Sequence, residues 1–271
     1  MRTAKYYVIL PLAIYLYYFI VPIKFLSNTK SVTIDYPRLV AGIDCPTCFL
    51  IFMRLHGDDK HMQPGKYMIS NTTTYNSLRQ DIIAGSGYVE FLTIPEGASK
   101  QDIITKIKQH KNITQTNTSM SLQAIPTTIR FSPGAADETV MAIANSFHNK
   151  VINNVRNSCP SYFQDKFEVV ASIIQKESAY KIEYPFIAAV IYNRIKQNMR
   201  LQVDVEPNSY HKLGLPDQPI SAPSIEALKA ACQPAKVDWL YYVALGKRHI
   251  FSSNYADHLQ IVNRRKYVHQ H

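Results

Sequence analysis

The sequence predicts an α+β protein built from a membrane helix, a small mixed unit and a larger helix-rich domain. Three observations predict this fold class. Residues 6–23 carry no charge, residues 31–95 alternate strand-like and helix-like segments, and the segments after residue 136 place apolar residues at helical spacing. With 271 residues, 46% of them hydrophobic, the chain is long and apolar enough for one or two folded domains.

The uncharged N-terminal stretch is close to the minimum length of a helix that crosses a bilayer. Arg2 and Lys5 precede it, as expected for a cytoplasmic N-terminus. A cleaved signal peptide is the alternative, but no small-residue cleavage site follows. We therefore expect residues 1–5 to be cytoplasmic, residues 6–26 to anchor the chain, and the rest to be exported. Export argues against nucleic acid as a partner, although the net charge is +10.

Residues 31–95 are expected to form a small β–α–β–α–β unit. Leu78, Ile82 and Ile83 share one face of a helix, and Gly85 stands where that helix would end. In chain order, we expect a strand at 31–37, a helix or strand at 48–55, a strand at 63–70, a helix at 74–85 and a strand at 88–94.

The rest of the chain is expected to be mainly helical. Ser99 and Asp102 resemble a helix-starting box, and residues 111–135 are polar enough to be a linker or long loop. Gly246 separates two strand-like runs, as in a hairpin. The expected helices are 99–110, 138–155, 163–180, 184–199, 224–232 and 254–268, with strands at 239–245 and 249–253.

The chain has four cysteines, and two of them form a Cys-x-x-Cys pair. Cys45 and Cys48 lack the strand-to-helix context of a thioredoxin-like redox motif, and no second pair of ligands supports a zinc site. We interpret this pair as a local disulfide or as two packed thiols. Cys159 and Cys232 carry no pattern of their own.

Glu177 is a carboxylic acid on the apolar side of a predicted helix. Val170, Ile173 and Ile174 precede it at spacings of three and four, so all four share one helix face. Burial disfavours the charged form of a carboxyl and raises its pKa, which suits a general acid. The alternatives are an ion pair with Arg194 or Arg200, or hydration at the helix end.

Ordered motifs along the exported part of the chain carry a family resemblance. They are "PGKYMIS", "LTIPEGAS", "ASIIQKES", "VIYNRIKQNMRLQVD", "NSYHKLGLPDQPISAPSIEALKAACQP" and "LYYVALGKRHIFSSNYADH". In this order and spacing they resemble the endolytic murein transglycosylase (YceG-like) family, over about residues 31–262.

The resemblance implies an architecture, an activity and a location. It implies a LysM-like subdomain at residues 31–95 and a catalytic domain at residues 96–271. The expected activity is endolytic cleavage of peptidoglycan glycan strands at MurNAc-GlcNAc bonds, leaving 1,6-anhydroMurNAc ends, with no metal or cofactor. The expected location is the inner membrane, with the C-terminal domain in the periplasm. The expected partners are cell-wall synthases, the penicillin-binding proteins.

Motif positions carry the family's functional residues onto this chain. The catalytic acid falls on Glu177. Glycan-binding roles are implied for Ser178, Asn193, Arg200, Gln202, Asp204, Asn208, Tyr210 and His249. Arg194 and His258 have simpler interpretations, as a solvated helix charge and a hydrogen-bonded helix histidine.

The chain departs from the family pattern beside these positions. Gln175 replaces a second Glu, Val205 and Glu206 replace Pro-Thr, and the loop after Asp204 is short. A non-catalytic glycan-binding protein therefore remains an alternative. So do a hydrolytic muramidase in which Asp204 activates water, and a redox protein that uses the Cys-x-x-Cys pair.

Overall fold

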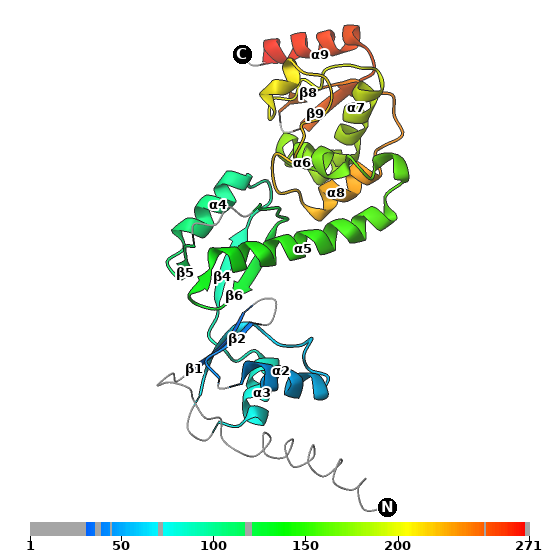
Figure 1. The fold of residues 1–271 in the computed structure, drawn as a ribbon. Helices are drawn as coiled ribbons and strands as arrows, with labels where there is room; N and C mark the ends of the chain where they lie inside the picture. Colours follow the sequence, from blue (N-terminus) through cyan, green and yellow to red (C-terminus); the bar gives the residue numbers. More distant parts are fainter. Residues whose placement is uncertain are drawn as a thin grey trace, which may run out of the picture. The chain divides into compact units, whose positions relative to one another are not determined.

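The computed structural model describes residues 31–35, 39–43, 45–69, 73–116, 121–246 and 248–268, and confirms a mixed α+β protein (Figure 1). The predicted cytoplasmic segment and the anchor at residues 6–26 lie outside this part of the chain. Within the described ranges, no helix is both long and apolar enough to cross a membrane.

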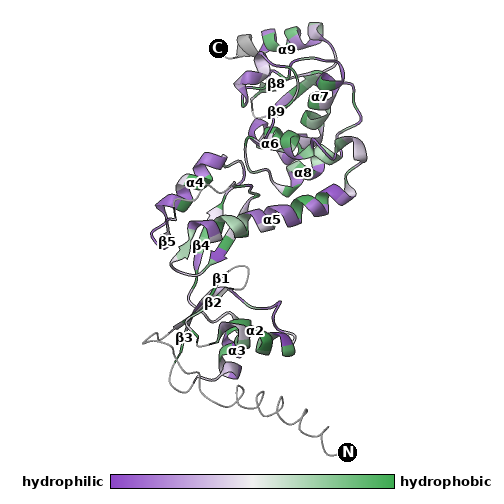
Figure 2. Ribbon diagram, viewed as in Figure 1, coloured by the Kyte–Doolittle hydropathy of each residue, from purple (hydrophilic) through white to green (hydrophobic). Residues whose placement is uncertain are grey.

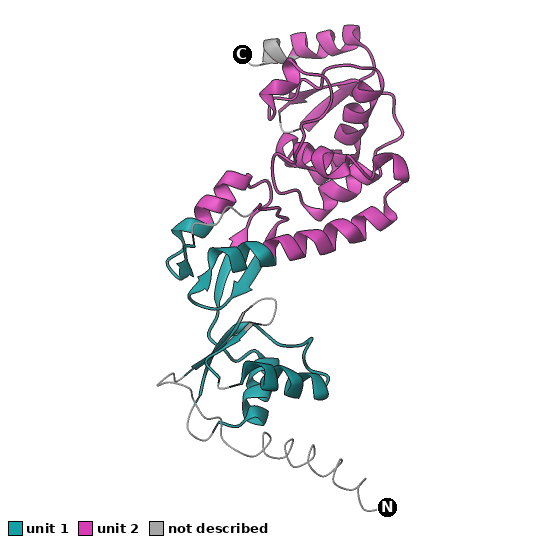
Figure 3. Ribbon diagram, in the orientation of Figure 1, with its two compact units in different colours: residues 1–92, 107–120, 128–143 teal, residues 93–106, 121–127, 144–271 magenta. Residues whose placement is uncertain are grey.

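The chain divides into two compact units, which Figure 3 shows in separate colours. The first comprises residues 1–92, 107–120 and 128–143, and the second comprises residues 93–106, 121–127 and 144–271. The predicted division near residue 95 lies close to the first of these crossings, but the chain returns twice. The LysM-like subdomain and the catalytic domain therefore stay predictions as units of function.

A small antiparallel sheet with two helices forms the body of the first unit. Its strands are β1 (Ser31–Asp35), β2 (Leu39–Ala41) and β3 (Gly65–Met68), in the order β2–β1–β3. Its helices are α2 (Pro46–Leu55) and α3 (Tyr75–Ala84), so the apolar segment at 48–55 is a helix. The strands alternate inward and outward residues as their sequence predicts. The core between sheet and helices includes Val32, Ile34, Phe49, Met53, Tyr67, Leu78 and Ile82.

Helix α3 begins and ends at the residues that its sequence indicates. Thr74 accepts a hydrogen bond from the backbone N–H of Ser77, and the Ser77 hydroxyl accepts one from the N–H of Thr74. This reciprocal pair satisfies two N–H groups that a helix start leaves free. At the other end, Gly85 adopts the left-handed conformation (φ +67°) of a C-terminal cap, as predicted.

Two further two-stranded sheets follow. Strand β4 (Glu90–Ile94) pairs with β6 (Thr127–Phe131), and β5 (Ile113–Thr114) pairs in parallel with β7 (Ala135–Ala136). Helix α4 (Lys100–Gln109) lies between β4 and β5 in the chain and begins at the predicted box of Ser99 with Asp102.

The prediction of a linker or long loop at residues 111–135 is therefore wrong. The segment contains β5, β6 and the start of β7. Ile129 and Phe131 are buried on alternate positions of β6, while Thr128 is exposed and Arg130 half-buried. Two buried apolar side chains are enough to hold so short a strand in place. The sequence of the segment is therefore mostly polar and shows no recognisable strand pattern. The last predicted strand of the small unit is present as β4, which pairs with β6, while Tyr88 just before it forms an antiparallel bridge to Lys66 of β3.

Four helices contribute to the main apolar core of the second unit. They are α5 (Asp137–Ser158), whose first part belongs to the first unit, α6 (Phe167–Glu177), α7 (Tyr184–Lys196) and α8 (Ile225–Cys232). Figure 2 shows that hydrophobic residues dominate α7. Helices α6, α7 and α8 pack against one another around the largest apolar cluster.

The predicted hairpin and closing helix are confirmed. Strand β8 (Tyr241–Leu245) pairs antiparallel with β9 (Arg248–Ser252), and Gly246 takes the left-handed conformation (φ +64°) at the turn. Helix α9 (Tyr255–Val268) packs against both strands.

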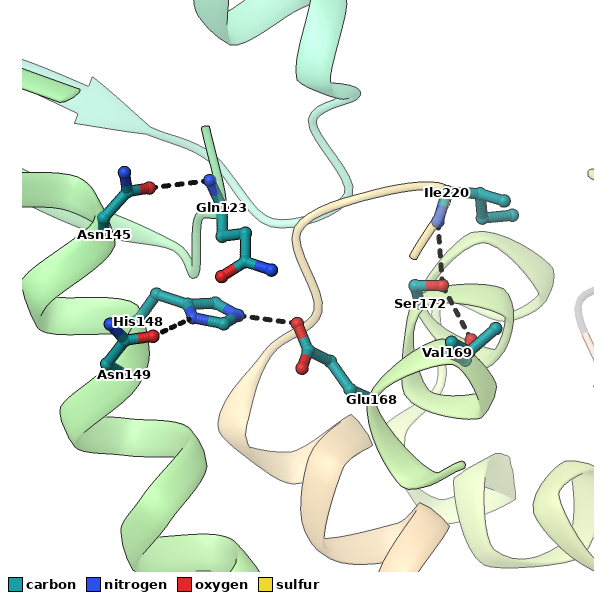
Figure 4. Close-up of polar contacts among 8 residues, drawn as sticks. All are labelled: Gln123, Asn145, His148, Asn149, Glu168, Val169, Ser172 and Ile220. Atoms are coloured by element: carbon teal, nitrogen blue, oxygen red, sulfur yellow. Dashed lines mark hydrogen bonds and ion pairs between the residues drawn. The ribbon is translucent and has the colours of Figure 1, made fainter. Parts of the chain in front are cut away.

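Helix α6 is buried on almost every side, and polar contacts hold it as well as apolar ones. At its first turn, Glu168 bonds the Nε2 of His148 from α5 at 2.6 Å (Figure 4). Further along, the Ser172 hydroxyl donates to the carbonyl of Val169 and accepts from the backbone N–H of Ile220. The direction of α6, and hence the position of its last residue, is fixed along its length.

Both pairs of cysteines are disulfides. Cys45 bonds Cys48 at the start of α2, which is the local pairing that the sequence favours. Cys159 bonds Cys232, which lies 73 positions later and ends α8. Both sulfurs of this second bridge are buried against the core of the second unit. Sequence alone offers no reason to pair residues so far apart.

Removal of the Cys159–Cys232 bridge is expected to lower the free energy of unfolding by about 4 kcal/mol. The bridge closes a loop of 73 positions, and the loss of unfolded-chain entropy grows with loop length. Non-reducing urea denaturation of the full-length chain in detergent would compare Cys159→Ala/Cys232→Ala with wild type. Cys45→Ala/Cys48→Ala is the matched control, because a loop of three positions contributes roughly 2 kcal/mol or less. An equal loss in both double variants would contradict this assignment.

Candidate functional site

Glu177 is the last residue of α6, and the chain leaves the helix at Ser178 in an extended conformation (φ −134°, ψ 140°). The side chain is half-buried, and its Oε1 is buried without a hydrogen-bond partner among the described residues. Neither Arg194 nor Arg200 forms an ion pair with it. The arginine pair that the sequence offered as an alternative is therefore wrong, while hydration at the helix end stays an alternative for the half-buried side chain.

The surroundings of Glu177 raise the pKa of its carboxyl. Burial is the largest cause, and the nearby Asp204 carboxylate adds to it. The Tyr242 hydroxyl, the backbone N–H of Val205 and the charge of His249 act in the opposite direction without cancelling the rise. A carboxyl in this environment retains its proton to higher pH than an ordinary glutamate does, as a general acid requires.

Tyr242, on strand β8, presents its hydroxyl to Glu177. The hydroxyl is buried and lacks a well-aligned hydrogen bond among the described residues. Burial and the neighbouring Glu177 raise the pKa of Tyr242 well above its usual value. The phenol therefore stays protonated and can donate to Glu177 once that carboxyl has lost its proton.

A second glutamate, Glu183, lies in the opposite electrostatic environment. It ends the short 3₁₀-helix η2 (Lys181–Glu183) and is only 5% exposed. The Ser178 hydroxyl donates to its Oε2 at 2.7 Å, the backbone N–H of His249 donates to its Oε1 at 3.0 Å, and the Nδ1 of His249 lies 2.8 Å from its Oε2.

Burial alone would raise the pKa of Glu183, but the hydrogen bonds from His249 and Ser178 outweigh it, and the pKa is lowered. The pKa values of two glutamates six positions apart, one half-buried and one buried, are thus shifted in opposite directions. A pair of carboxyls separated in this way commonly divides the roles of proton donor and fixed anion. Glu177 has the properties of the proton donor.

The loop after α7 carries the next predicted residues, and the buried Arg194 holds it in place. The Nη1 of Arg194 donates to the carbonyls of Arg200 (3.1 Å) and Leu201 (2.6 Å) and to the Oε1 of Gln202 (3.3 Å). Its Nε donates to the carbonyl of Leu240 at 2.6 Å, just before β8. Arg194 is therefore a structural clamp and not the solvated helix charge that the sequence suggested.

The loop places Asp204 beside Glu177 and Tyr210. Gln202 takes a left-handed backbone conformation (φ +51°), which costs a non-glycine residue about 1–3 kcal/mol and is commonest at functional sites. The Tyr210 hydroxyl donates to Oδ1 of Asp204 at 2.5 Å. Both side chains are exposed, and the charge of Glu177 contributes to raising the pKa of Tyr210. Asp204 and Tyr210 therefore lie within electrostatic reach of the candidate acid.

The remaining predicted glycan-binding residues are Asn193, Arg200 and Asn208. The Asn193 amide donates to the carbonyls of Val237 and Trp239 (2.9 and 3.0 Å), so it holds the chain before the hairpin. Arg200 and Asn208 are exposed. Their glycan contacts stay predictions.

His258 does not have the hydrogen-bonded ring that the sequence suggested. Its Nδ1 is buried without a partner among the described residues, and its ring stacks on Tyr241 with centroids 5.2 Å apart. Burial, helped by the charge of Arg194, lowers its pKa.

Sequence reasoning missed Glu183 and Tyr242 and misjudged Arg194. The contacts that define them join residues 46 to 66 positions apart, which periodicity cannot reveal. Within the described ranges, no cluster of three or more His, Cys, Asp or Glu side chains could hold a metal ion.

Comparison with known proteins places the chain in a family. A family model described as the YceG-like family matches residues 39–206 and 206–264. A crystal structure of a YceG-like protein from Listeria monocytogenes superposes with a TM-score of 0.50, over 80% of this chain and 90% of that one, at 21% sequence identity. At that identity the likeness shows a shared fold.

Two curated relatives carry the name endolytic murein transglycosylase. The Bacillus subtilis protein (strain 168) is 31% identical over 101 residues, which cover 29% of this chain and 28% of the relative. The Streptococcus pneumoniae protein (strain D39) is 29% identical over 119 residues, which cover 33% and 21%. The matched segments thus span less than a third of either relative's length.

Replacement of Glu177 by Gln is expected to stabilise the folded protein at pH 7, on the order of 1 kcal/mol. The pKa of Glu177 is higher in the folded than in the unfolded state, so the wild type loses stability as pH rises above the unfolded value. Urea denaturation of the full-length chain in detergent should show a gap between variant and wild type that narrows toward pH 4.

Glu168→Gln is the matched control, because it removes a carboxylate that is paired with a buried histidine and should destabilise the fold. A Glu177→Gln variant no more stable than wild type at pH 7 would show that the carboxyl carries no cost of burial.

Proposed function

Because the chain belongs to the YceG-like family, we propose that it is a lytic transglycosylase that cleaves peptidoglycan glycan strands internally. The names of the Bacillus and Streptococcus relatives support this activity. The observation that carries the proposal is the environment of Glu177. A half-buried carboxyl with a raised pKa, one of whose oxygens has no hydrogen-bond partner among the residues that the structure describes, stands at the end of helix α6.

One proton-carrying carboxyl is sufficient for this chemistry, because the nucleophile belongs to the substrate. Glu177 gives its proton to the glycosidic oxygen between MurNAc and GlcNAc as the bond from that oxygen to C1 of MurNAc breaks. The 2-acetamido group stabilises the positive charge that develops at C1. The C6 hydroxyl oxygen of the same sugar then bonds to C1 and releases its proton to Glu177. No water is consumed, and the enzyme returns to its protonated form.

The residues around Glu177 support both halves of this cycle. Burial favours the protonated form before bond cleavage. After proton transfer, the Tyr242 hydroxyl and the Val205 N–H are the groups that favour the carboxylate. Donors aimed at the charge that develops lower the barrier without reorganisation. Arg194 and Glu183 contribute by fixing the surrounding chain.

Hydrolysis on the same scaffold is the second candidate, and the position of Asp204 favours it. Its carboxylate lies close enough to raise the pKa of Glu177, and an inverting glycosidase uses such a second carboxylate to activate water. Asp204, however, already accepts the Tyr210 hydroxyl, and the family relationship favours the transglycosylase.

The location and partners follow from the proposed activity. The segment at residues 6–26, of which residues 6–23 carry no charge, would anchor the chain in the inner membrane, with the folded part in the periplasm beside its glycan substrate. Cell-wall synthases, the penicillin-binding proteins, are the expected partners, since they make the strands that an endolytic enzyme cuts.

Purified sacculi incubated with the full-length chain in detergent are expected to yield 1,6-anhydroMurNAc ends, one water lighter than hydrolysis products. Glu177→Gln should reduce their formation by more than roughly 10³-fold, because the only proton donor of the reaction is lost. Mass spectrometry of the released fragments distinguishes the outcomes. Reducing MurNAc ends that disappear in Asp204→Asn would support the hydrolase instead. No cleavage by a folded wild-type protein would leave the binding protein as the function.

Tyr242→Phe is expected to move the alkaline limb of the pH profile of kcat/KM to higher pH. The limb reports loss of the acid form of Glu177, and the Tyr242 hydroxyl lowers the pKa of that carboxyl. Removal of the hydroxyl should therefore raise the pKa. Tyr241→Phe is the matched control on the adjacent strand position. A limb that stays in place or moves to lower pH would show that the hydroxyl does not act on Glu177.

A further inference from the structure

The Glu183–His249 pair is a feature that the proposed reaction does not use. Glu183 is buried and ionised, so it cannot supply a proton. It accepts three hydrogen bonds, one from the residue directly after Glu177 and two from strand β9. A buried carboxylate with three donors is one whose position is closely determined.

The contact between the two side chains settles which ring nitrogen of His249 carries hydrogen. An ionised carboxylate can only accept, so the Nδ1 that lies 2.8 Å from Glu183 must be the protonated nitrogen. In the neutral ring, Nε2 is then an acceptor. Within the described part of the chain, no hydrogen-bond partner occupies Nε2.

The ring of His249 lies next to the reacting group. It packs edge-on against the ring of Tyr242, with centroids 5.2 Å apart and an interplanar angle of 87°. The Tyr242 hydroxyl in turn lies beside Glu177 and acts on its carboxyl. A series of contacts therefore runs from Ser178 through Glu183, His249 and Tyr242 back to the catalytic carboxyl.

We propose that Glu183 is a positioning residue that fixes His249 with hydrogen on Nδ1, so that Nε2 accepts a hydrogen bond from a glycan hydroxyl or acetamido N–H beside Glu177. This inference rests on the proposed function for the identity of the ligand. Glu183 would then orient the substrate through His249, in addition to linking strand β9 to the end of α6 by hydrogen bonds.

Glu183→Gln separates this role from a merely structural one. The glutamine keeps the size of the side chain and one acceptor oxygen for the backbone N–H of His249. Its NH₂ group, now facing the ring, donates to Nδ1, which drives the ring hydrogen to Nε2. The acceptor that faces the glycan is thereby converted into a donor.

Nitrogen-15 NMR of histidine-labelled full-length chain in detergent reads the tautomer directly. We expect Nδ1–H in wild type and Nε2–H in Glu183→Gln, with His249→Gln used to assign the resonance. Glu168→Gln is the matched control, because Glu168 bonds another buried histidine, His148, at the first turn of α6 (Figure 4). It should leave the His249 signal unchanged.

Kinetics on sacculi complete the test. Glu183→Gln should lower kcat/KM by roughly 10–100-fold, the size of the loss seen when the hydrogen-bond partner that orients a metal-ligating histidine is removed. The double variant with His249→Gln should lose no more than His249→Gln alone. A folded Glu183→Gln protein that keeps Nδ1–H or wild-type kcat/KM would overturn the proposal.

The tautomer measurement needs no turnover, so the two proposals can fail separately. Addition of purified glycan strands to the inactive Glu177→Gln protein should shift the Nε2 resonance of His249. An Nδ1–H tautomer that is present in wild type but unaffected by glycan would overturn the role of His249. Absence of cleavage by wild type, with the glycan-induced shift intact, would overturn the transglycosylase activity alone.

Discussion

The buried guanidinium of Arg194 joins the segments from which the site is made. It is only 8% exposed, and it donates to the loop after α7 and to the chain just before β8. The loop carries Asp204, and the hairpin that follows carries Tyr242 and His249. A buried cation is unfavourable unless its donors are satisfied, and here backbone carbonyls satisfy them. Because those carbonyls belong to both segments, the charge can be buried only when both are in place.

The two glutamates near the end of α6 show how the fold divides one side-chain type between two tasks. Glu183 is surrounded by donors and is stable as an anion. Glu177, six positions earlier, is half-buried, its Oε1 has no hydrogen-bond partner in the described part of the chain, and its pKa is raised. The first arrangement contributes rigidity, and the second costs stability, as is common at functional sites. Glu177 itself ends α6, beside the loop that carries the exposed Asp204.

The sequence predicts local structure well and distant contacts poorly. The stripe of Ile173 and Ile174 leads directly to Glu177, and Gly85 and Gly246 mark the ends of elements where the structure has them. The partners of Arg194 and Glu183 lie too far along the chain for any spacing rule to connect them. Strand β6 escaped prediction because two buried side chains in a polar segment are too few to form a pattern.

The two disulfides differ in when both of their cysteines become available during the proposed export. Cys45 and Cys48 would reach the oxidising side of the membrane almost together, whereas Cys159 must wait until residue 232 has followed. Four cysteines can pair in three ways, but a close pair that oxidises first withdraws both its thiols from competition. Vectorial synthesis, in which N-terminal regions fold first, therefore favours the native connectivity. Early formation of the short Cys-x-x-Cys bridge would then prevent its two thiols from mispairing with Cys159 or Cys232. The long bridge, which is expected to contribute more to stability, could therefore form correctly.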